Sequence, residues 1–145
     1  IYKISLWTQT QTINLTMVTR EEKKEFCSTN GYVKYAGVHL VIEVWKAKNL
    51  SSLPLIEKAL RQAVDACGAT LLKIDLHQFS PSGGISGVAI IQESHISIHT
   101  WPEYQYAAID IFVCGEVDPY KAIPVLKEYF GSDNMQIAEL KRGIL

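Results

Sequence analysis

Hydrophobic and polar residues follow two different periods along this chain of 145 residues. Residues 37–45 read GVHLVIEVW, an apolar run rich in β-branched side chains that predicts a strand. In residues 52–68, SLPLIEKALRQAVDACG, the apolar positions recur at helical spacing and so fall on one face of a helix. Ser52 is the expected N-cap of that helix, and Gly68 is its expected end.

Short β-rich segments separated by turn residues occupy much of the rest of the chain. They are residues 69–79, 85–92, 93–101 and 104–115. Because the connections between them are short, consecutive segments are expected to pair as an antiparallel meander.

A second helix and a final strand complete the pattern. Residues 118–131 predict the helix, with Asp118 and Pro119 at its start and Pro124 expected to bend it or to shift that start. Residues 135–145 predict the strand. Two helices and about six strands predict the α+β fold class, a two-layer sandwich whose mainly antiparallel sheet is covered on one face by two helices.

The N-terminal part of the chain is expected to lie outside this fold. Residues 1–30 are predicted to form an extension or arm, and residues 31–145 to form a single domain. Within the arm, residues 2–18 predict an edge strand or a partly ordered segment, and Thr19 opens a short charged stretch that predicts a helical turn. Met17 is a candidate start of translation, which would make the first 16 residues an extension or a family-specific addition.

Composition and charge narrow the classes of function. Hydrophobic residues make up 48% of the chain, no apolar run has the length of a membrane span, and the first residues lack the pattern of a secretion signal. Because 14 Lys and Arg balance 15 Asp and Glu, neither nucleic acid nor a membrane is an expected partner. Cys27, Cys67 and Cys114 are far apart and predict neither a disulfide framework nor a zinc site. We therefore expect a soluble protein of the cytoplasm.

Residues 93–103, ESHISIHTWPE, carry many polar groups for a strand. Alternation places four of them on one side: Glu93, His95, Ser97 and His99. Along a strand the two histidines are about 13 Å apart, too far to share a metal ion, and no GxSxG-type turn presents a hydrolytic serine. No metal is expected, and a half-solvated sheet face would by itself explain the polar residues.

The longer segment 79–115, FSPSGGISGVAIIQESHISIHTWPEYQYAAIDIFVCG, closely resembles the self-processing core of the prokaryotic S-adenosylmethionine decarboxylases, the pyruvoyl enzymes of spermidine biosynthesis. The resemblance extends more weakly over residues 37–142. It implies that the chain is a proenzyme that cuts its own peptide bond between Glu93 and Ser94.

Self-cleavage gives the serine a chemical purpose. The Ser94 hydroxyl attacks the carbonyl of Glu93 and exchanges an amide for an ester, and β-elimination and hydrolysis then leave a pyruvoyl group in place of the serine. The products would be a β chain of residues 1–93 and an α chain of residues 94–145. A substrate amine forms a Schiff base with the pyruvoyl ketone, which accepts the electrons released with carbon dioxide, so no diffusible cofactor is required.

The resemblance also implies roles for other residues. His99 is the implied base of processing, since elimination needs a base near the serine Cα and neutral imidazole is abundant near pH 7. Ser86 occupies the position implicated in processing, where a developing oxyanion needs polar donors. Cys114 matches the proton donor that completes decarboxylation. For His95, a structural role and a direct role both stay open.

Substrate binding and assembly are implied less directly. Phe79 and Trp101 are the candidates for stacking on adenine, and Glu103 is the candidate for binding ribose hydroxyl groups. Residues 81–87, PSGGISG, form a connection one residue longer than the family's PxGxSG and border this site. A homodimer of processed units is also implied, with sites near the boundary between subunits.

Two other functions stay open at this point. Relatives with this fold and motif decarboxylate arginine or another basic amino acid, so the same chemistry would act on a different substrate. A noncatalytic partner subunit would keep the fold alone. The intact set of Glu93, Ser94, His99 and Cys114 argues against that alternative, because an interaction protein needs none of these residues together.

Overall fold

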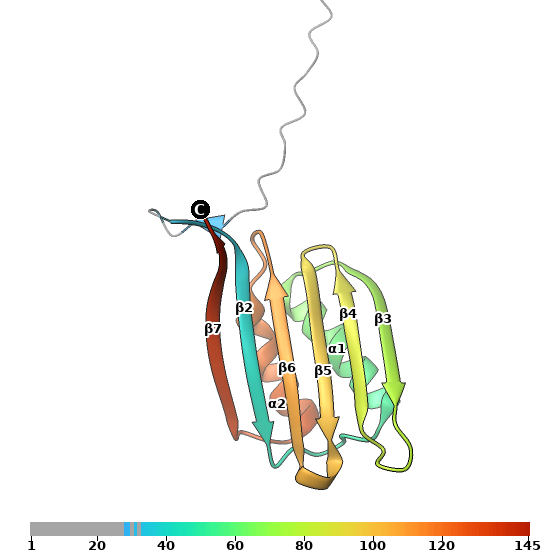
Figure 1. Ribbon diagram of the computed structural model, residues 1–145. Coiled ribbons are helices and arrows are strands. Elements are labelled where there is room, and N and C mark those ends of the chain that lie inside the picture. Colours follow the sequence, from blue (N-terminus) through green and yellow to red (C-terminus); the bar gives the residue numbers. More distant parts are fainter. Residues whose placement is uncertain (1–27, 30, 32) are drawn as a thin grey trace, which may run out of the picture.

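The computed structural model describes residues 28–29, 31 and 33–145, which form one sheet with two helices on one of its faces (Figure 1). The strands are β1 (Ser28–Thr29), β2 (Lys34–Trp45), β3 (Leu71–Gln78), β4 (Ile85–Ile91), β5 (Ser94–Trp101), β6 (Tyr106–Val113) and β7 (Met135–Ile144). The helices are α1 (Leu53–Cys67) and α2 (Ala122–Phe130), and short 3-10 turns span Pro102–Tyr104 and Pro119–Lys121. The expectations for residues 2–18, Thr19 and Cys27 fall outside the described residues.

The strands of the sheet run in the order β7-β2-β6-β5-β4-β3, and β1 pairs with the first residues of β2. Every described strand pair is antiparallel. Strands β3 to β6 are neighbours in chain order, as the predicted meander requires, and β2 lies between β6 and β7. The α+β two-layer sandwich predicted from the sequence is therefore confirmed.

Both helices begin and end where their local sequence allows. Ser52 precedes α1 without a side-chain cap, and Gly68 ends it with a left-handed φ of 77°, a conformation that costs glycine little. Helix α2 begins only at Ala122, after the 3-10 turn that Asp118 caps by accepting a hydrogen bond from the backbone N–H of Tyr120. Pro124 thus lies in the first turn, where a backbone N–H has no partner in the helix, and the helix starts at Ala122, later than the expected start at Asp118.

The core lies between the helices and one face of the sheet. Alternate residues of the central strands face the helices and are buried, as Ile42, Ile98 and Ile109 illustrate. The helices meet them with apolar stripes that include Leu60 and Phe130, both at most 1% exposed. Burying each such side chain contributes about 1.5–3 kcal/mol to folding.

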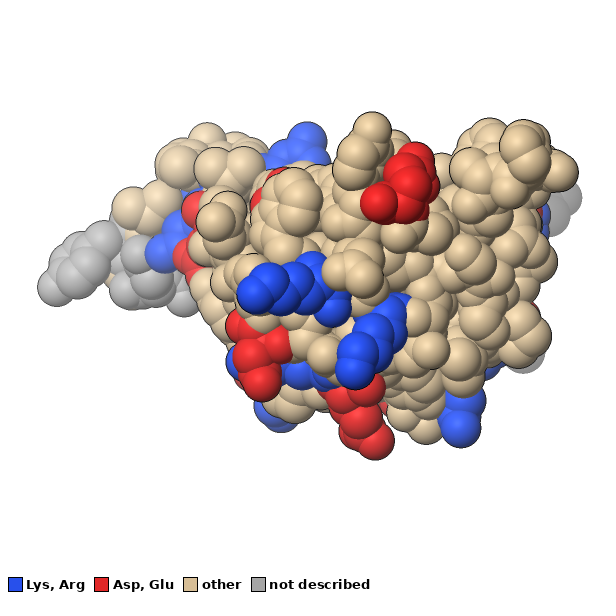
Figure 2. Space-filling view, turned by 90° about the horizontal axis from the view of Figure 1, so that it is seen from below, with Lys and Arg blue, Asp and Glu red and all other residues tan. Residues whose placement is uncertain are grey.

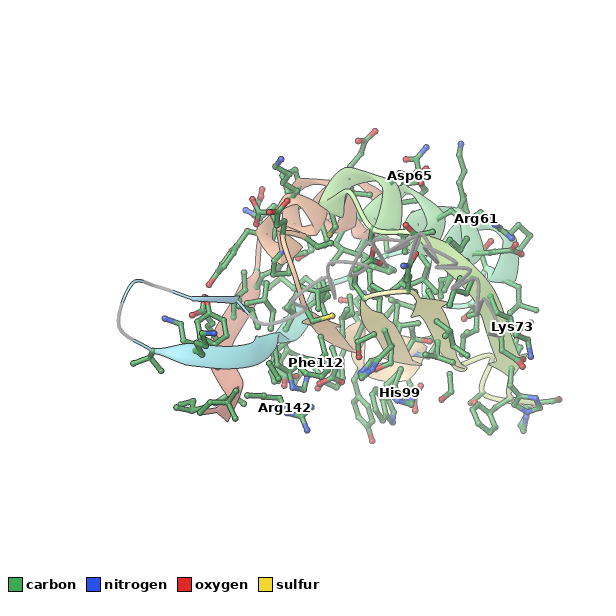
Figure 3. The ribbon with its side chains drawn as sticks, turned by 90° about the horizontal axis from the view of Figure 1, so that it is seen from above. Arg61, Asp65, Lys73, His99, Phe112 and Arg142 are labelled. Atoms are coloured by element: carbon green, nitrogen blue, oxygen red, sulfur yellow. The ribbon has the colours of Figure 1, made fainter. Side chains whose placement is uncertain are left out.

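No helix of the described residues lies over the other face of the sheet. Figure 3 shows Phe112, His99 and Arg142 on the side of the sheet away from α1, whose residues Arg61 and Asp65 mark the opposite side of the molecule. We call this uncovered side the open face. At the end of the molecule seen in Figure 2, basic and acidic side chains lie next to one another, and neither sign forms a dominant patch. None of the helices among the described residues is long and apolar enough to span a membrane.

Candidate active site

The backbone is unusual at the first residue of β5. Ser94 has a φ of 142°, far from the values of an ordinary strand. The other described non-glycine residues with positive φ, Lys46, Asn49 and Gln105, have values of 50° to 62°, within the common left-handed region. A residue held in such a sparsely populated conformation costs about 1–3 kcal/mol, so backbone strain lies at Ser94, directly after the Glu93–Ser94 peptide bond.

Glu93, the residue on the other side of this bond, is held by two hydrogen bonds. The carbonyl oxygen of Glu93 accepts a hydrogen bond from the backbone N–H of Cys114, with 3.0 Å between nitrogen and oxygen. The carboxylate of Glu93 accepts another from the backbone N–H of Thr70, at 2.9 Å. Cys114 is brought here by the pairing of β5 with β6, which sets Ser94 opposite Val113. Glu93 and Cys114, 21 positions apart in the sequence, thereby become neighbours.

A cavity of about 490 Å³ opens beside these residues. Its walls include Glu93, Cys114, Asp118 and Lys121, and the buried Cys67. Burial raises the pKa of the Cys67 thiol to about 11, so this thiol keeps its proton at neutral pH. Cys114 is only partly buried, and its thiol is therefore the more accessible of the two.

A second group of predicted site residues lies at the opposite end of β5. Ser86 and His99 are register partners in β4 and β5, and Ser86 Oγ lies 2.8 Å from His99 Nδ1. Phe79, Trp101 and Glu103 join them around a cavity of about 380 Å³.

The connection that precedes Ser86 packs tightly against this second group. The backbone N–H of Phe79 donates to the carbonyl oxygen of Gly84 at 2.8 Å, which closes the loop. Gly84 approaches the neighbouring strand so closely that a Cβ there would lie 2.8 Å from the carbonyl oxygen of Thr100. Glycine is thus the residue this approach allows.

Within one chain the two groups are not brought together. Glu93, Ser94 and Cys114 form what we call the cleavage-end group, and the residues around Ser86 and His99 form the His99-end group. His99 follows Ser94 by five residues in an extended strand, so the two lie about 16 Å apart. A base must come within hydrogen-bond reach of the proton it removes, and His99 does not reach Ser94 of its own chain.

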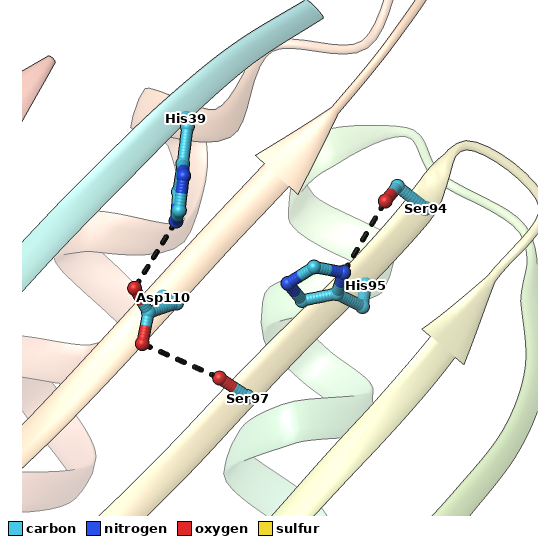
Figure 4. Close-up of polar contacts among 5 residues, drawn as sticks. All are labelled: His39, Ser94, His95, Ser97 and Asp110. Carbon is cyan, nitrogen blue, oxygen red and sulfur yellow. Dashed lines mark hydrogen bonds and ion pairs between the residues drawn. The ribbon is translucent and has the colours of Figure 1, made fainter. Parts of the chain in front are cut away.

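Polar residues between the two groups connect three strands of the open face (Figure 4). His39 Nε2 lies 3.1 Å from Asp110 Oδ1, and the Ser97 hydroxyl donates to Asp110 Oδ2 at 3.4 Å. Beside them, Ser94 Oγ lies 3.2 Å from His95 Nδ1. His39 and Asp110 were not predicted from the sequence, although a histidine and an aspartate inside otherwise apolar strands were the available signal.

An aromatic row lies on the open face near the His99-end group. The ring of Tyr106 stacks on Trp45 and on Trp101, with centroids 4.4 and 5.2 Å apart. The Tyr106 hydroxyl donates a short hydrogen bond to Glu43. Burial first, and then the hydrogen bond and charge of Glu43, raise the pKa of Tyr106 to about 12.

The described residues contain no group of three or more His, Cys, Asp and Glu side chains that could hold a metal ion. The polar groups at both ends of β5 instead offer what acid-base chemistry needs: a hydroxyl, imidazoles, a thiol and carboxylates.

Comparison with known proteins identifies relatives of the chain. A family profile described as S-adenosylmethionine decarboxylase matches residues 38–143. A protein of Thermomicrobium roseum named S-adenosylmethionine decarboxylase proenzyme is 46% identical over 114 residues, which are 78% of this chain and 98% of the relative. One of the same name from Methanococcus maripaludis strain C5 is 47% identical over 116 residues, 78% of this chain and 94% of the relative.

A solved structure has a similar fold. The crystal structure of the adenosylmethionine decarboxylase from Aquifex aeolicus VF5 matches with a TM-score of 0.65 and 29% sequence identity. The match covers 75% of this chain and 92% of that one.

Proposed function

Since the matching profile covers most of its length, this chain belongs to the S-adenosylmethionine decarboxylase family, and we propose that it decarboxylates S-adenosylmethionine with a carbonyl group made from Ser94. The proposal rests on the backbone conformation and the hydrogen bonding on the two sides of the Glu93–Ser94 bond. On one side of the bond, the backbone of Ser94 is strained, with a φ of 142°. The carbonyl on the other side accepts a hydrogen bond from the N–H of Cys114.

These features suit an attack by the Ser94 hydroxyl on the carbonyl of Glu93. The attack turns the carbonyl oxygen into an oxyanion, and a donor already in place stabilises that charge without reorganisation. Exchange of the amide for an ester releases the backbone constraint at Ser94. The residues present thus fit the formation of a pyruvoyl group, and cleavage separates residues 1–93 from residues 94–145.

The pyruvoyl group, once formed, supplies a carbonyl that binds a substrate amine and accepts the electrons released with carbon dioxide. The Cys114 thiol lies in the cavity wall beside this position and donates the proton that the substrate carbon needs. Three carboxylates, those of Glu93, Glu116 and Asp118, line the same cavity. They outnumber its one cation, Lys121, which favours a substrate that carries a sulfonium and an ammonium charge.

The His99-end group binds the nucleoside part of the substrate. Phe79 and Trp101 are 48% and 38% exposed, so their rings are available for stacking on a base. Glu103 lines the same cavity and accepts hydrogen bonds from ribose hydroxyl groups.

Because these two groups are about 16 Å apart along β5, a complete site requires a second copy of the chain. In this dimer the open faces of two copies stack on each other, related by a two-fold axis that runs across the strands. The strands of one copy then run opposite to those of the other. His99 of one copy therefore lies over Ser94 of the other. The open face also exposes large apolar side chains, Trp45 at 41% and Leu140 at 53% among them. A homodimer covers this surface and completes two sites at once.

Release of labelled carbon dioxide tests the proposed substrate. Carboxyl-labelled S-adenosylmethionine should lose its label in the presence of the purified protein, whereas labelled arginine should not. The Ser94→Ala chain, which cannot form the carbonyl, is the background control. Release from arginine alone would assign the chain a different substrate, and release from neither, with a processed chain, would contradict both.

A further inference from the structure

In the uncut chain, His95 lies next to Ser94, the nucleophile of the cleavage-end group. His95 Nδ1 is 3.2 Å from Ser94 Oγ, which is within hydrogen-bond distance (Figure 4). The two residues are adjacent in sequence, and on a regular strand their side chains would point to opposite faces. The unusual φ of Ser94 changes that arrangement, so the strained backbone and the contact between Ser94 and His95 occur at the same residue.

The surroundings of His95 favour its neutral form. Burial lowers the pKa of His95 below 6.5, and the nearby His39 lowers it further. From the other strands packed here, the carboxylate of Asp110 acts in the opposite direction and Arg142 acts in the same direction as His39. A neutral imidazole with its proton on Nε2 presents an unprotonated Nδ1 to the Ser94 hydroxyl.

Asp110 has a partner of its own on this face. Its Oδ1 lies 3.1 Å from His39 Nε2, and its Oδ2 accepts a hydrogen bond from Ser97. The hydrogen-bond contacts of Asp110 are thus with His39 and Ser97, whereas that of His95 Nδ1 is with Ser94.

We infer that His95 is the base that removes the Ser94 hydroxyl proton in the first step of self-cleavage. The inference rests on the proposed function and adds to it a residue for the amide-to-ester exchange. His99, at the far end of β5, acts only in the later elimination. The His99 that acts on a given Ser94 comes from a second copy of the chain.

The step is balanced without any further reactant. The O–H bond of Ser94 breaks, its proton moves to His95 Nδ1, and Oγ bonds to the carbonyl carbon of Glu93. The C–N bond of the peptide then breaks, and its nitrogen takes the proton from Nδ1. His95 ends the step as it began, and the chain is joined by an ester.

Hydroxylamine separates the two steps because it cuts esters under conditions that leave amides intact. Chains made by cell-free synthesis would be followed from the uncut state, with and without hydroxylamine, by gel electrophoresis and mass. We expect His99→Ala to accumulate an ester that hydroxylamine cuts between residues 93 and 94. We expect His95→Ala to form both the ester and the cut product at least about 100-fold more slowly, the range of general base catalysis. The matched control is His77→Ala, which removes an exposed imidazole on β3.

Several outcomes would overturn the inference. One is His95→Ala forming the ester at the wild-type rate, and another is a His95→Ala chain that stays uncut yet is opened by hydroxylamine. Should His95→Ala not fold, as judged by urea unfolding, His95→Gln keeps a polar side chain but accepts no proton and should be equally slow. Added imidazole should restore cleavage to a folded His95→Ala chain.

A pH profile tests the same step without a substitution at His95. In the His99→Ala chain, the initial rate of ester formation should fall as the pH drops through a value below 6.5, because only neutral His95 accepts the proton. A rate that rises as the pH drops, or one that stays unchanged down to the pH at which the chain unfolds, would overturn the inference. A wild-type chain that never cleaves would instead contradict the proposed function itself.

Discussion

The backbone N–H of Cys114 donates a hydrogen bond to the carbonyl oxygen of Glu93, with 3.0 Å between the two atoms. The same residue lines the adjoining cavity. In the proposed function, one residue therefore serves two reactions through different atoms: we expect the N–H to stabilise the oxyanion of self-cleavage and the thiol to supply the proton that completes decarboxylation.

Substitution of Cys114 by alanine separates these two roles. Alanine keeps the N–H, so the Cys114→Ala chain should cleave itself as the wild type does. It lacks the thiol, so kcat should fall by about 100-fold or more, the usual effect of losing a general acid. Gel electrophoresis measures the first result and carbon dioxide release the second. An uncut Cys114→Ala chain, or one with unchanged kcat, would contradict the division of roles.

The distance between His99 and Ser94 predicts complementation between two inactive variants. Chains with Ser94→Ala lack the nucleophile and chains with His99→Ala lack the base of elimination, so each should stay uncut when expressed alone. In a mixed dimer, the Ser94→Ala chain provides an intact His99 over the intact Ser94 of its partner. Co-expression should therefore cut the His99→Ala chain and leave the Ser94→Ala chain whole.

Different affinity tags on the two variants let mass spectrometry identify the cut chain. Two copies of the same variant, each with one of the tags, are the matched control and should show no cleavage. Absence of cleavage in a mixed dimer that has been isolated through both tags would mean that one chain holds a complete site.

The two described cysteines should differ in reactivity toward iodoacetamide. The thiolate is the reactive form, and burial raises the pKa of Cys67 to about 11, so Cys67 should resist alkylation near pH 8. Cys114, which is only partly buried, should react first. Peptide mapping after a short exposure distinguishes the two sites. Equal labelling of both would contradict the buried position of Cys67.

Much of the fold could be predicted because each strand and helix carries a local pattern. Residues 37–45 and 85–92 show their β-branched runs directly, and Gly68 marks the end of a helix. The start of α2 could not be fixed, because Asp118 and Pro119 begin a 3-10 turn with the same signals that begin a helix.

The site was predicted as a set of residues, but its division into two groups was not. The spacing of a strand alone separates His99 from Ser94, since five extended residues cover about 16 Å. The contact of Cys114 with Glu93 depends instead on the register of β5 against β6, which no local pattern specifies. The φ of 142° at Ser94 is likewise a feature that no local pattern predicts.

Tyr106 should make the fold sensitive to alkaline pH. Its pKa is raised from 10 in the unfolded chain to about 12 in the folded one, so its contribution to stability is complete below pH 10 and is lost as the pH rises toward 12. The free energy of unfolding in urea should fall less between pH 9 and pH 11 in Tyr106→Phe than in the wild type. Equal falls in both proteins would contradict this origin of the pH dependence.

The mass of the purified protein under denaturing conditions tests the central claim most directly, with the Ser94→Ala chain as its control. We predict two fragments, residues 1–93 and residues 94–145, from the wild type, and one folded, uncut chain from Ser94→Ala. The second fragment should be lighter than a chain that begins with serine by the mass of ammonia, as a pyruvoyl group requires. A single intact wild-type chain, or two fragments from Ser94→Ala, would contradict the conversion of Ser94 into the catalytic carbonyl.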